Sequence, residues 1–448
     1  LLVLHSGGGA TTIAEARNRP VILAASGPAA GTVAAAEVAL LAGRADAVCC
    51  HMGGTSVDIA IITDGVAHRR QKVEIEGIDT ALPAVDVYSI GAGGGSIAWV
   101  DSRGLLRVGP KSARATPGPV CYGRGGVEPT VTDAMVVLGY VDPARFMDGR
   151  MELDVEGAKA ACARLGESLG LTAIDVAAGI RDITLAEMER AVRTRVTSQG
   201  LDVGRMSMVA YGGAGALFAP SLARDLGFES VLVPTVASVL SAYGAMSADI
   251  RRERVLGIDA VLPLDDSALR KSLDQLLQQV DDELALDGVH SDDRELICEV
   301  DMRFHRQKSS MTMVVAPEDV RTDALAAGFR NKYFEQFGPN SLTENASVEV
   351  ATLRVIGVGR SIRGQLPADL PASETSFLEP SEERVVWQRG GRSITVPVYE
   401  MEGMRIGHVV TGPAIVEAKD TSVSVPEGSR VTLGRGRTLE IQFQNDES

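Results

Sequence analysis

The sequence contains few aromatic residues, 4% of its 448 positions, and no long hydrophobic run. Its longest uncharged stretches, residues 20–36 and 230–248, include proline, glycine, serine and threonine. A membrane helix needs about 20 predominantly apolar residues, so neither stretch predicts one. No secretory signal is visible either. We therefore expect a cytoplasmic protein without a membrane partner.

Basic residues are in the minority, since 44 Lys and Arg stand against 59 Asp and Glu, a formal net charge of −15. No run of Lys or Arg of useful length occurs, and a nucleic-acid binder needs a basic face to replace phosphate counterions. We expect no nucleic-acid partner. With 45% hydrophobic and 23% charged residues, the composition is that of a folded chain long enough for two or three domains.

Clustered metal ligands and several common catalytic motifs are also missing. The six histidines show no H-x-x-x-H spacing, and no C-x-x-C pair occurs, so we predict no zinc site and no metal-ligating cluster. Neither a G-x-x-x-x-G-K-[ST] loop nor a G-x-S-x-G elbow is present. The odd number of cysteines indicates reduced thiols: Cys49, Cys50, Cys121, Cys162 and Cys298.

Glycine, in contrast, is abundant at 48 residues, and many glycines lie between apolar runs. Up to residue 252 the pattern predicts an α/β domain. We expect strands at 1–4, 47–50 and 57–63, a core run at 21–25, and helices at 27–42, 153–169 and 173–198.

Beyond residue 252 the pattern of apolar and polar residues changes, and we expect two further domains. Residues 253–363 predict a second α/β domain, and residues 364–448 predict a linker followed by a β-rich C-terminal module. The expected elements are helices at 265–286 and 320–337, two strands within 295–315, a strand at 347–357, a linker at 364–379 and short strands within 384–443.

The first motif of interest is a strand, the turn Gly53-Gly54-Thr55-Ser56 and a second strand that contains Asp58. Glycine allows close backbone approach to a ligand, and successive N–H groups with two hydroxyls can bind a phosphate. A tight hairpin without a ligand is the alternative. Asp58 has two readings as well: it holds a metal-bound water, or it caps the turn.

The second motif, residues 209–219, is a short strand, a glycine-rich turn and the start of a helix. Its glycines are Gly212, Gly213 and Gly215. Such a turn can seat a nucleotide at a helix N-terminus, where the dipole and free N–H groups favour anions. Simple strand–helix packing is the alternative.

The order of four elements is more specific than either motif. Residues 26–35, the Gly53-Gly54 loop, the Gly212-Gly213 turn and residues 239–245 follow each other. This order resembles the connecting helices, second phosphate loop and adenosine loop of actin-like ATPases, which have a ribonuclease H-like fold. The first phosphate loop of that superfamily lies nearer the N-terminus. We therefore expect the N-terminal portion of the domain to be missing from this sequence and to act as a partner of it.

A third stretch narrows the resemblance. Gly-Ala-Gly-Gly-Gly-Ser-Ile-Ala at 91–98 and Pro-Thr-Val-Thr-Asp-Ala at 129–134 resemble the hydantoinase A / 5-oxoprolinase family, which includes large subunits of acetone and acetophenone carboxylases. Residues 301–307, and the C-terminal motif 412–417 with Asp420-Thr421, extend the resemblance over nearly the whole chain. The glycine triplet at 93–95 fits either ligand approach or close packing.

The resemblance implies a fold, a reaction and partners. It implies ATP with Mg²⁺, phosphorylation of a carbonyl oxygen, and hydrolysis of a cyclic amide such as a hydantoin, 5-oxoproline or another lactam. The chain would be the A-type subunit of a hetero-oligomer with a B-type subunit and a small-molecule substrate. The alternatives are a subunit of an ATP-dependent ketone carboxylase, or a non-catalytic scaffold subunit with a degenerate ATPase site.

The resemblance also implies site residues. The phosphate loop would comprise Gly53, Gly54, Thr55 and Ser56, and the adenosine side Gly212, Gly213 and Gly215. The catalytic candidates are Asp58, Asp133 and His51.

Asp133 orients water or metal, or else caps the helix that follows it.

The chain departs from the family pattern at four positions. His51 replaces an Asp, Arg114 and Arg306 replace Gly, and Met135 replaces Asn. Because imidazole is a poor ligand for Mg²⁺, these changes suggest altered or lost ATP hydrolysis, although an active enzyme remains the other reading.

Overall fold

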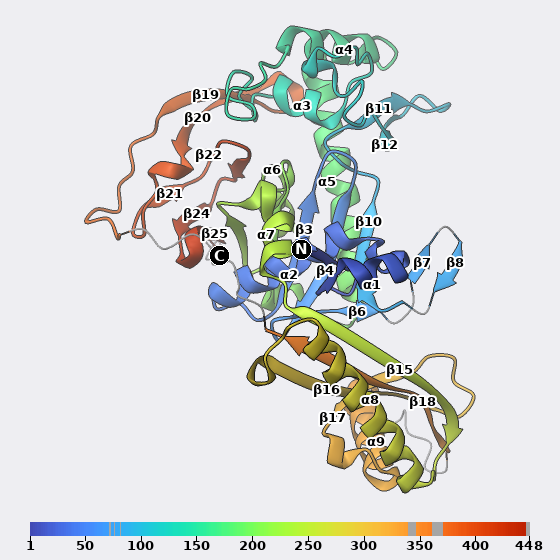
Figure 1. Cartoon of the computed structure of the whole chain (residues 1–448). Coiled ribbons are helices and arrows are strands. Elements are labelled where there is room, and N and C mark those ends of the chain that lie inside the picture. Colours follow the sequence, from blue (N-terminus) through green and yellow to red (C-terminus); the bar gives the residue numbers. More distant parts are fainter. Residues whose placement is uncertain (71–72, 76, 81, 339–345, 361–370, 445–448) are drawn as a thin grey trace. The chain divides into compact units, whose positions relative to one another are not determined.

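The computed structural model describes residues 1–70, 73–75, 77–80, 82–338, 346–360 and 371–444. Two compact units make up the chain, and neither is continuous in sequence. Unit 1 contains Leu1–His5, Gly9–Ala24 and Ser247–Arg363. Unit 2 contains Ser6–Gly8, Ala25–Met246 and Gly364–Ser448 (Figure 1). This division differs from the three consecutive domains expected from the sequence, residues 1–252, 253–363 and 364–448.

Unit 2 is built on a nine-stranded sheet. Strands β10, β4 and β3 are antiparallel, β3, β13 and β14 are parallel, and β14, β25, β24 and β21 are antiparallel, with β5 paired to β4. β3, β13 and β14 are almost fully buried, which matches their continuous apolar sequences. The bounds are β3 Ala47–Met52, β4 Val57–Thr63, β5 Val66–Ala67, β10 Val87–Ile90, β13 Ser207–Tyr211, β14 Ser230–Pro234, β21 Val409–Thr411, β24 Ser429–Leu433 and β25 Thr438–Phe443.

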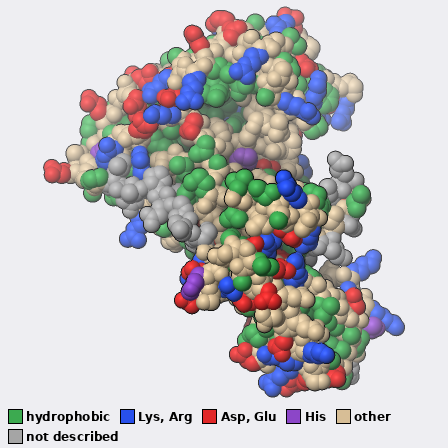
Figure 2. All heavy atoms as spheres, in the orientation of Figure 1, with side chains coloured by type: hydrophobic (Ala, Val, Ile, Leu, Met, Phe, Trp, Pro, Cys, Tyr) green, Lys and Arg blue, Asp and Glu red, His purple; other side chains and the backbone are tan. Residues whose placement is uncertain are grey.

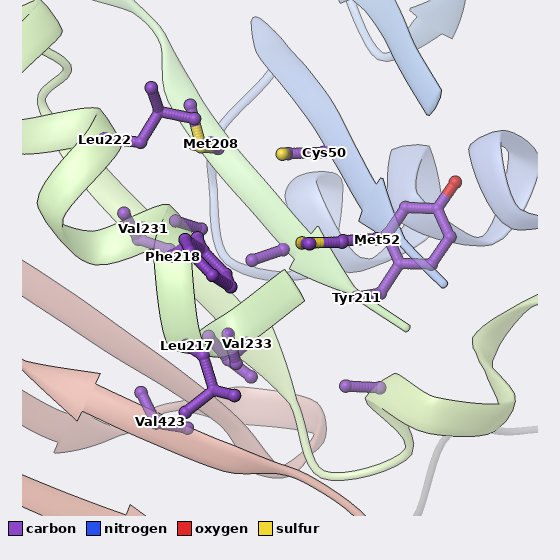
Figure 3. Close-up of a cluster of buried hydrophobic side chains, with 14 of the residues drawn as sticks. Cys50, Met52, Met208, Tyr211, Leu217, Phe218, Leu222, Val231, Val233 and Val423 are labelled. Atoms are coloured by element: carbon purple, nitrogen blue, oxygen red, sulfur yellow. The ribbon is translucent and has the colours of Figure 1, made fainter. Parts of the chain in front are cut away.

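Three helices pack on this sheet: α2 (Ser26–Leu41), α5 (Ala173–Thr197) and α6 (Gly215–Leu226). Small residues let α2 approach β13 closely, because a Cβ on Gly31 would lie 2.6 Å from the hydroxyl of Tyr211. Figure 3 shows the apolar contacts of α6, where Phe218 lies beside Val231 of β14. The helices expected at 27–42 and 173–198 are confirmed within one residue at each end.

Between β10 and α5 the chain forms a smaller cluster of elements. It contains the hairpin of β11 (Ser96–Val100) and β12 (Leu106–Ser112), followed by α3 (Val131–Val137) and α4 (Val155–Glu167). Both α3 and α4 contact α5, whose 25 residues extend from the sheet into this cluster (Figure 1). Two further hairpin-like pairs are β6 (Arg69–Arg70) with β9 (Ala84–Val85) and β7 (Val73–Ile75) with β8 (Ile78–Thr80).

The described residues of the C-terminal segment are β-rich with short 3₁₀ turns, and they are part of unit 2. β19 (Glu382–Trp387), β20 (Ser393–Glu400), β22 (Ala414–Glu417) and β23 (Ser422–Val425) form a four-stranded sheet. β21, β24 and β25 instead extend the central sheet, because β25 pairs with the edge of β14 from Ser230 to Pro234. Of the expected linker at 364–379, residues 364–370 lie outside the described residues.

Unit 1 is a six-stranded sheet with helices, in the order β1-β2-β15-β18-β16-β17. Its helix α8 buries Leu269, Leu273, Leu276, Val280 and Leu284, the spacing of one helical face. Residues 20–23 form a 3₁₀ turn, with only Ile22 buried, instead of the expected core run. The bounds are β1 Leu2–Leu4, β2 Ala10–Thr12, α1 Ile13–Asn18, β15 Ile250–Val261, α8 Asp266–Leu286, β16 Arg294–Phe304, β17 Met311–Val315, α9 Thr322–Phe337 and β18 Val348–Gly359.

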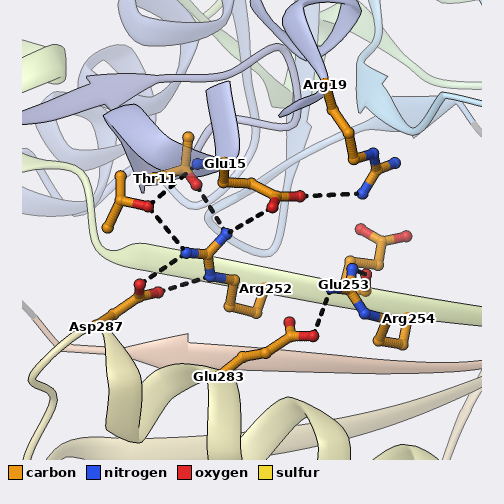
Figure 4. A network of polar contacts seen from close by, with 9 residues as sticks. Thr11, Glu15, Arg19, Arg252, Glu253, Arg254, Glu283 and Asp287 are labelled. Atoms are coloured by element: carbon orange, nitrogen blue, oxygen red, sulfur yellow. Dashed lines mark hydrogen bonds and ion pairs between the residues drawn. The ribbon is translucent and has the colours of Figure 1, made fainter. Parts of the chain in front are cut away.

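A buried arginine ties the N-terminal residues to unit 1. Arg252 of β15 donates to Asp287, at 2.6 and 2.7 Å, and to Oγ1 of Thr11 at 3.0 Å (Figure 4). Glu15 lies 4.0 Å from the same guanidinium group. Because a buried charge is tolerated only when it is paired, this network explains why residues 9–24 belong with a strand 240 positions later.

The surface is mixed in charge. On the face drawn in Figure 2, acidic and basic side chains are interspersed among apolar ones. No helix within the described part of the chain has both the length and the apolar character needed to cross a membrane.

Candidate functional site

The Gly53–Ser56 turn connects two paired strands of unit 2. β3 and β4 are antiparallel with His51 opposite Asp58, and the N–H of Gly53 donates to the carbonyl of Ser56 at 3.1 Å. The turn is therefore the tip of a tight hairpin. No side-chain or backbone atom outside its immediate neighbours would lie within 4 Å of a Cβ on Gly54. The backbone at Gly54 is thus open to close approach.

The glycine triplet packs directly on this turn. The N–H of Gly94 donates to the carbonyl of Gly53 at 2.9 Å, and that of Gly95 to the carbonyl of Gly54 at 2.7 Å. A Cβ on Gly93 would lie 2.5 Å from the nitrogen of Thr55. Only glycine fits so close to backbone, so Gly93 serves close packing, against a loop and not against a helix, which leaves the ligand reading open for Gly94.

The second glycine turn meets the same end of the sheet. Because β3 and β13 are parallel neighbours, their carboxyl ends lie side by side. A Cβ on Gly212, where φ is +85°, would lie 2.4 Å from the carbonyl oxygen of Met52. Gly215 is the first residue of α6, and Ala214 caps that helix without a side-chain hydrogen bond. At this end the N–H of Ala214 donates to the carbonyl of Met52 and that of Leu217 to the carbonyl of Ala214, both at 3.2 Å, so an anion could be met only by the N–H groups of Gly215 and Ala216.

Both turns open on one cavity of ≈ 640 Å³ in unit 2. Gly53, Gly54, Gly94 and Gly213 line it, and Thr132 adds a hydroxyl. The predicted residues Thr55, Ser56, Gly212 and Gly215 belong to the same turns but are not part of the lining. His51, Asp58 and Asp133 do not line it either.

His51 and Asp58 form a pair beside the first turn. Nδ1 of His51 lies 2.9 Å from Oδ2 of Asp58, and the imidazole stacks on Tyr211 with centroids 4.9 Å apart. Burial raises the pKa of Asp58, but hydrogen bonds from His51, Ser89 and Ser56 outweigh it, so the pKa lies below its usual range. An ionised carboxylate only accepts hydrogen bonds, so Nδ1 of His51 is the donor in this pair.

Asp133 is fully buried behind the cavity wall. Its carboxylate accepts hydrogen bonds from the N–H groups of Val120, Cys121 and Thr130, at 3.1, 2.7 and 2.8 Å, and from the hydroxyl of Thr130 at 2.8 Å. Thr130 caps α3, and together the two residues form a capping box. The expectation that Asp133 itself caps a helix following it is therefore wrong in detail: Thr130 is the N-cap, and Asp133 is the third residue of α3 and completes the capping box. A part in catalysis stays a prediction.

The opposite wall of the cavity comes from residues that the motifs did not single out as site residues. Arg145 and Arg150 follow α3, while Lys419 and Thr421 lie between β22 and β23. Arg145 pairs with Glu400 at 3.0 Å, and Lys419 pairs with Glu402 at 3.1 Å. These residues lie on irregular segments, where no periodicity points to a site. Thr421 occurs in the C-terminal motif, which served as evidence of the family resemblance and did not predict a site residue.

Three of the departures from the family pattern have structural correlates. Arg114 and Arg306 have φ values of +56° and +73°, the left-handed region that favours glycine. The backbone conformation expected for glycine is thus kept although the residue is arginine. Met135 is buried in α3 and lines the cavity.

One group of carboxylates, Asp142, Glu382 and Glu417, has the spacing of a cation site. Arg384 occupies its centre, since it pairs with all three: with Asp142 at 3.2 Å, and more closely with Glu382 and Glu417. An arginine in that place already balances the charge, so the group is a structural ion-pair network.

Comparison with known proteins covers almost the entire chain. The family model for Hydantoinase/oxoprolinase matches residues 1–254, and that for the Hydantoinase/oxoprolinase C-terminal domain matches residues 264–443. The caprolactamase subunit alpha of Pseudomonas jessenii is 31% identical over 446 residues, which are 98% of this chain and 64% of that protein. The acetophenone carboxylase gamma subunit of Aromatoleum aromaticum is 30% identical over 448 residues, which are 96% of this chain and 61% of that protein.

Solved structures agree with this result. The crystal structure of ATP-dependent caprolactamase from Pseudomonas jessenii superposes with a TM-score of 0.83 at 29% identity, covering 99% of this chain and 65% of that chain. Nucleotide-free acetone carboxylase superposes with a TM-score of 0.80 at 25% identity, covering 99% of this chain and 64% of that chain. The mixed α/β fold is therefore shared, and the chain spans less than two thirds of the length of these relatives.

Proposed function

The chain belongs to the hydantoinase/oxoprolinase family, and from this premise we propose that it is the ATP-handling, A-type subunit of a hetero-oligomeric enzyme that hydrolyses a cyclic amide. The observation that carries the proposal is the cavity on which three glycine segments open, at Gly53-Gly54, Gly94 and Gly213. These segments are far apart in sequence. Their convergence at the carboxyl ends of β3 and β13 suits a ligand with several phosphate groups.

The sheet order supports an actin-like ATPase domain. In the order β10-β4-β3-β13-β14, the first three strands are antiparallel and β13 and β14 run parallel to β3, as expected of a ribonuclease H-like fold. The phosphate turn lies between β3 and β4, and the adenosine turn follows β13. Both positions agree with those that the family resemblance implies.

The residues fit ATP. The open backbone at Gly54 and Gly213 and the uncapped start of α6 offer N–H donors, and the hydroxyl of Thr55 adds to them, whereas the hydroxyl of Ser56 is already donated to Asp58. When bound, ATP would supply the phosphoryl group that activates the amide carbonyl oxygen. The chain's own contribution is to position the phosphates and to neutralise the negative charge that spreads over them.

The fit for Mg²⁺ rests on one carboxylate at this turn. Asp58 is ionised, whereas the imidazole of His51 is a poor ligand for so hard a cation. We therefore propose that Asp58 is the residue that would hold a hydrated Mg²⁺ at this turn, and that His51 fixes the orientation of that carboxylate through Nδ1.

The decisive experiment measures ATP hydrolysis by the native assembly in the presence of 5-oxoproline, hydantoins, small lactams and ketones. Stimulation by a cyclic amide supports the proposal and identifies the substrate class. Stimulation by a ketone with bicarbonate would assign a carboxylase instead, which similarity to the acetone and acetophenone carboxylase subunits favours as the second candidate.

The variant His51→Asp tests the third possibility, a scaffold subunit. If ATP hydrolysis is absent in the native protein and appears in His51→Asp, the native chain has lost its ATPase activity. His290→Asp, at a histidine whose side chain is 73% exposed in unit 1, is the matched control and should change nothing.

A further inference from the structure

Unit 1 has a cavity of its own, of ≈ 530 Å³, where α9 lies beside the edge strand β17 (Figure 1). The side chains of Phe329, Tyr333 and Phe337 line it from α9. They continue a stack of rings that begins at Phe304, with centroids 4.6–5.6 Å apart. Phe337, at the end of the stack, is 55% exposed. A chain with only 4% aromatic residues thus leaves an aromatic surface open to a partner.

The backbone of β17 is the second feature of this surface. β17 is the last strand of the six-stranded sheet, and within the described residues β16 is the one strand with which it pairs. Alternate N–H and C=O groups of such an edge point away from the sheet and can pair with an added strand. The sequence of β17, Met-Thr-Met-Val-Val, contains no charge and no proline, and Val314 is 69% exposed. The strand itself therefore does not prevent an extended segment from pairing with it.

The charges at this cavity have one sign. Lys308 and Lys332 line it, and none of the described Asp or Glu residues does. Nζ of Lys332 donates to the carbonyl of Thr312 in β17 at 3.0 Å, so its ammonium group lies against the edge strand. The two lysines favour an occupant that carries carboxylates.

These charges argue against a second copy of this chain as the occupant. Two copies that pair through β17 would be related by a twofold axis, so each would present the same lysines to the other. Like charges that face each other are destabilising, and each chain carries a net charge of −15 besides. The surface therefore fits a different chain.

We propose that the edge of β17 and the aromatic cavity beside it bind an extended, acidic segment of the B-type subunit, which adds a strand to the sheet of unit 1. Side chains of an added strand alternate between the two faces of the sheet. Met313 packs in the buried cluster that includes α9, so its neighbour Val314 lies on the opposite face. One set of partner side chains would meet the aromatic rings and the lysines, and the other set would meet Val314. This inference rests on the proposed function in taking the assembly to contain a second kind of subunit.

The test reverses both charges in the native assembly. Lys308→Glu/Lys332→Glu is compared with Lys159→Glu/Lys271→Glu, which makes the same change of net charge at exposed lysines of α4 and α8, outside this cavity. Mass photometry over a dilution series measures the dissociation constant of the second subunit. We expect it to rise roughly tenfold for the first variant, the effect of losing two exposed charge pairs, and less than about twofold for the control.

Hydrogen exchange gives the second readout, because it reports on the backbone. In the wild-type assembly, amides within Met311–Val315 should exchange at least about tenfold more slowly than in the free chain that dissociates on dilution. In Lys308→Glu/Lys332→Glu this difference should shrink.

The outcomes separate this inference from the proposed function. Unprotected amides in β17 and an unchanged dissociation constant would overturn the inference alone, provided that a cyclic amide still stimulates ATP hydrolysis. Protected amides in an assembly that no cyclic amide stimulates would support the docking site and overturn the proposed function. An assembly built from this chain alone would overturn both. If Lys308→Glu/Lys332→Glu self-associates through β17 while the second subunit stays bound, the lysines only guard the edge against other copies, and the inference is wrong.

Discussion

The most buried arginine of unit 1 and the polar groups on the cavity wall of unit 2 are paired to different extents. In the sheet of unit 1, the guanidinium group of Arg354 is 3% exposed and lies 2.7–2.9 Å from three carboxylates: Glu253, Glu299 and Asp301. On the cavity wall of unit 2, Thr421 has a buried hydroxyl without a partner, and Arg150 has no ion pair within the described residues. Charges that are paired internally stabilise a fold, and the cavity at which we propose that a ligand binds lies in unit 2.

The largest effect should follow from breaking the charge network of unit 1. Arg354→Met removes the shared partner of three carboxylates, each at most 17% exposed, and leaves them close together. We expect the free energy of unfolding to fall by about 3–5 kcal/mol, the usual cost of an uncompensated buried charge. Urea denaturation followed by circular dichroism measures it.

The matched control for this prediction is Arg270→Met. Arg270 forms a half-exposed pair with Asp274 at 3.0 Å, so its loss should cost less than about 1 kcal/mol. Equal losses in the two variants would contradict the distinction between the buried and exposed pairs.

A smaller effect is expected from Gly93→Ala in unit 2. The new Cβ would lie 2.5–2.6 Å from the nitrogens of Thr55 and Ser56, so the phosphate turn must move. Overpacking of this kind costs about 1–3 kcal/mol. Nucleotide binding, measured by titration calorimetry, should weaken together with the stability.

Gly27→Ala provides the control for that change. Gly27 lies in α2 and has no positive φ, and a Cβ added there would meet no atom within 4 Å, so alanine should be neutral or slightly stabilising. Normal nucleotide binding by Gly93→Ala would show that the phosphate turn tolerates displacement, against our prediction.

The smallest effect concerns backbone strain, which the two units share. Arg306 of unit 1 and Arg114 of unit 2 both have left-handed φ values. Replacing either with glycine should raise the free energy of unfolding by about 0.5–1 kcal/mol, because glycine adopts this region without steric cost but gains entropy when unfolded. Alanine at the same positions keeps the Cβ and should give no gain. Thermal unfolding of the four variants measures the difference.

Local features of the fold could be predicted from the sequence. The strand at Val57–Thr63 and the helix at 266–286 have clear apolar patterns, and the structure places them within a residue of the expected bounds. The Gly53–Ser56 and Gly212–Gly215 turns stand out because glycine clusters between strands have few other uses. Their convergence on one cavity follows from the parallel pairing of β3 and β13.

Long-range features could not be predicted in the same way. The strand β25 (Thr-Leu-Glu-Ile-Gln-Phe) is a short, partly apolar strand like its neighbours, so nothing local shows that it pairs with β14 in place of its own module. Arg145, Arg150 and Lys419 lie on irregular segments, where position depends on tertiary packing. The missing partner of Thr421 is a property of three-dimensional surroundings and leaves no trace in the sequence.

The pairing of β14 with β25 has a consequence for synthesis of the chain. β14 ends at Pro234, and β25 begins about two hundred residues later, at Thr438. At about 5–20 residues per second, a ribosome needs roughly 10–40 s to cover that distance. During this interval the edge of a buried, apolar strand has no partner from its own chain, and such an edge invites pairing with other chains. We therefore expect a chaperone to shield this half-finished sheet in the cell.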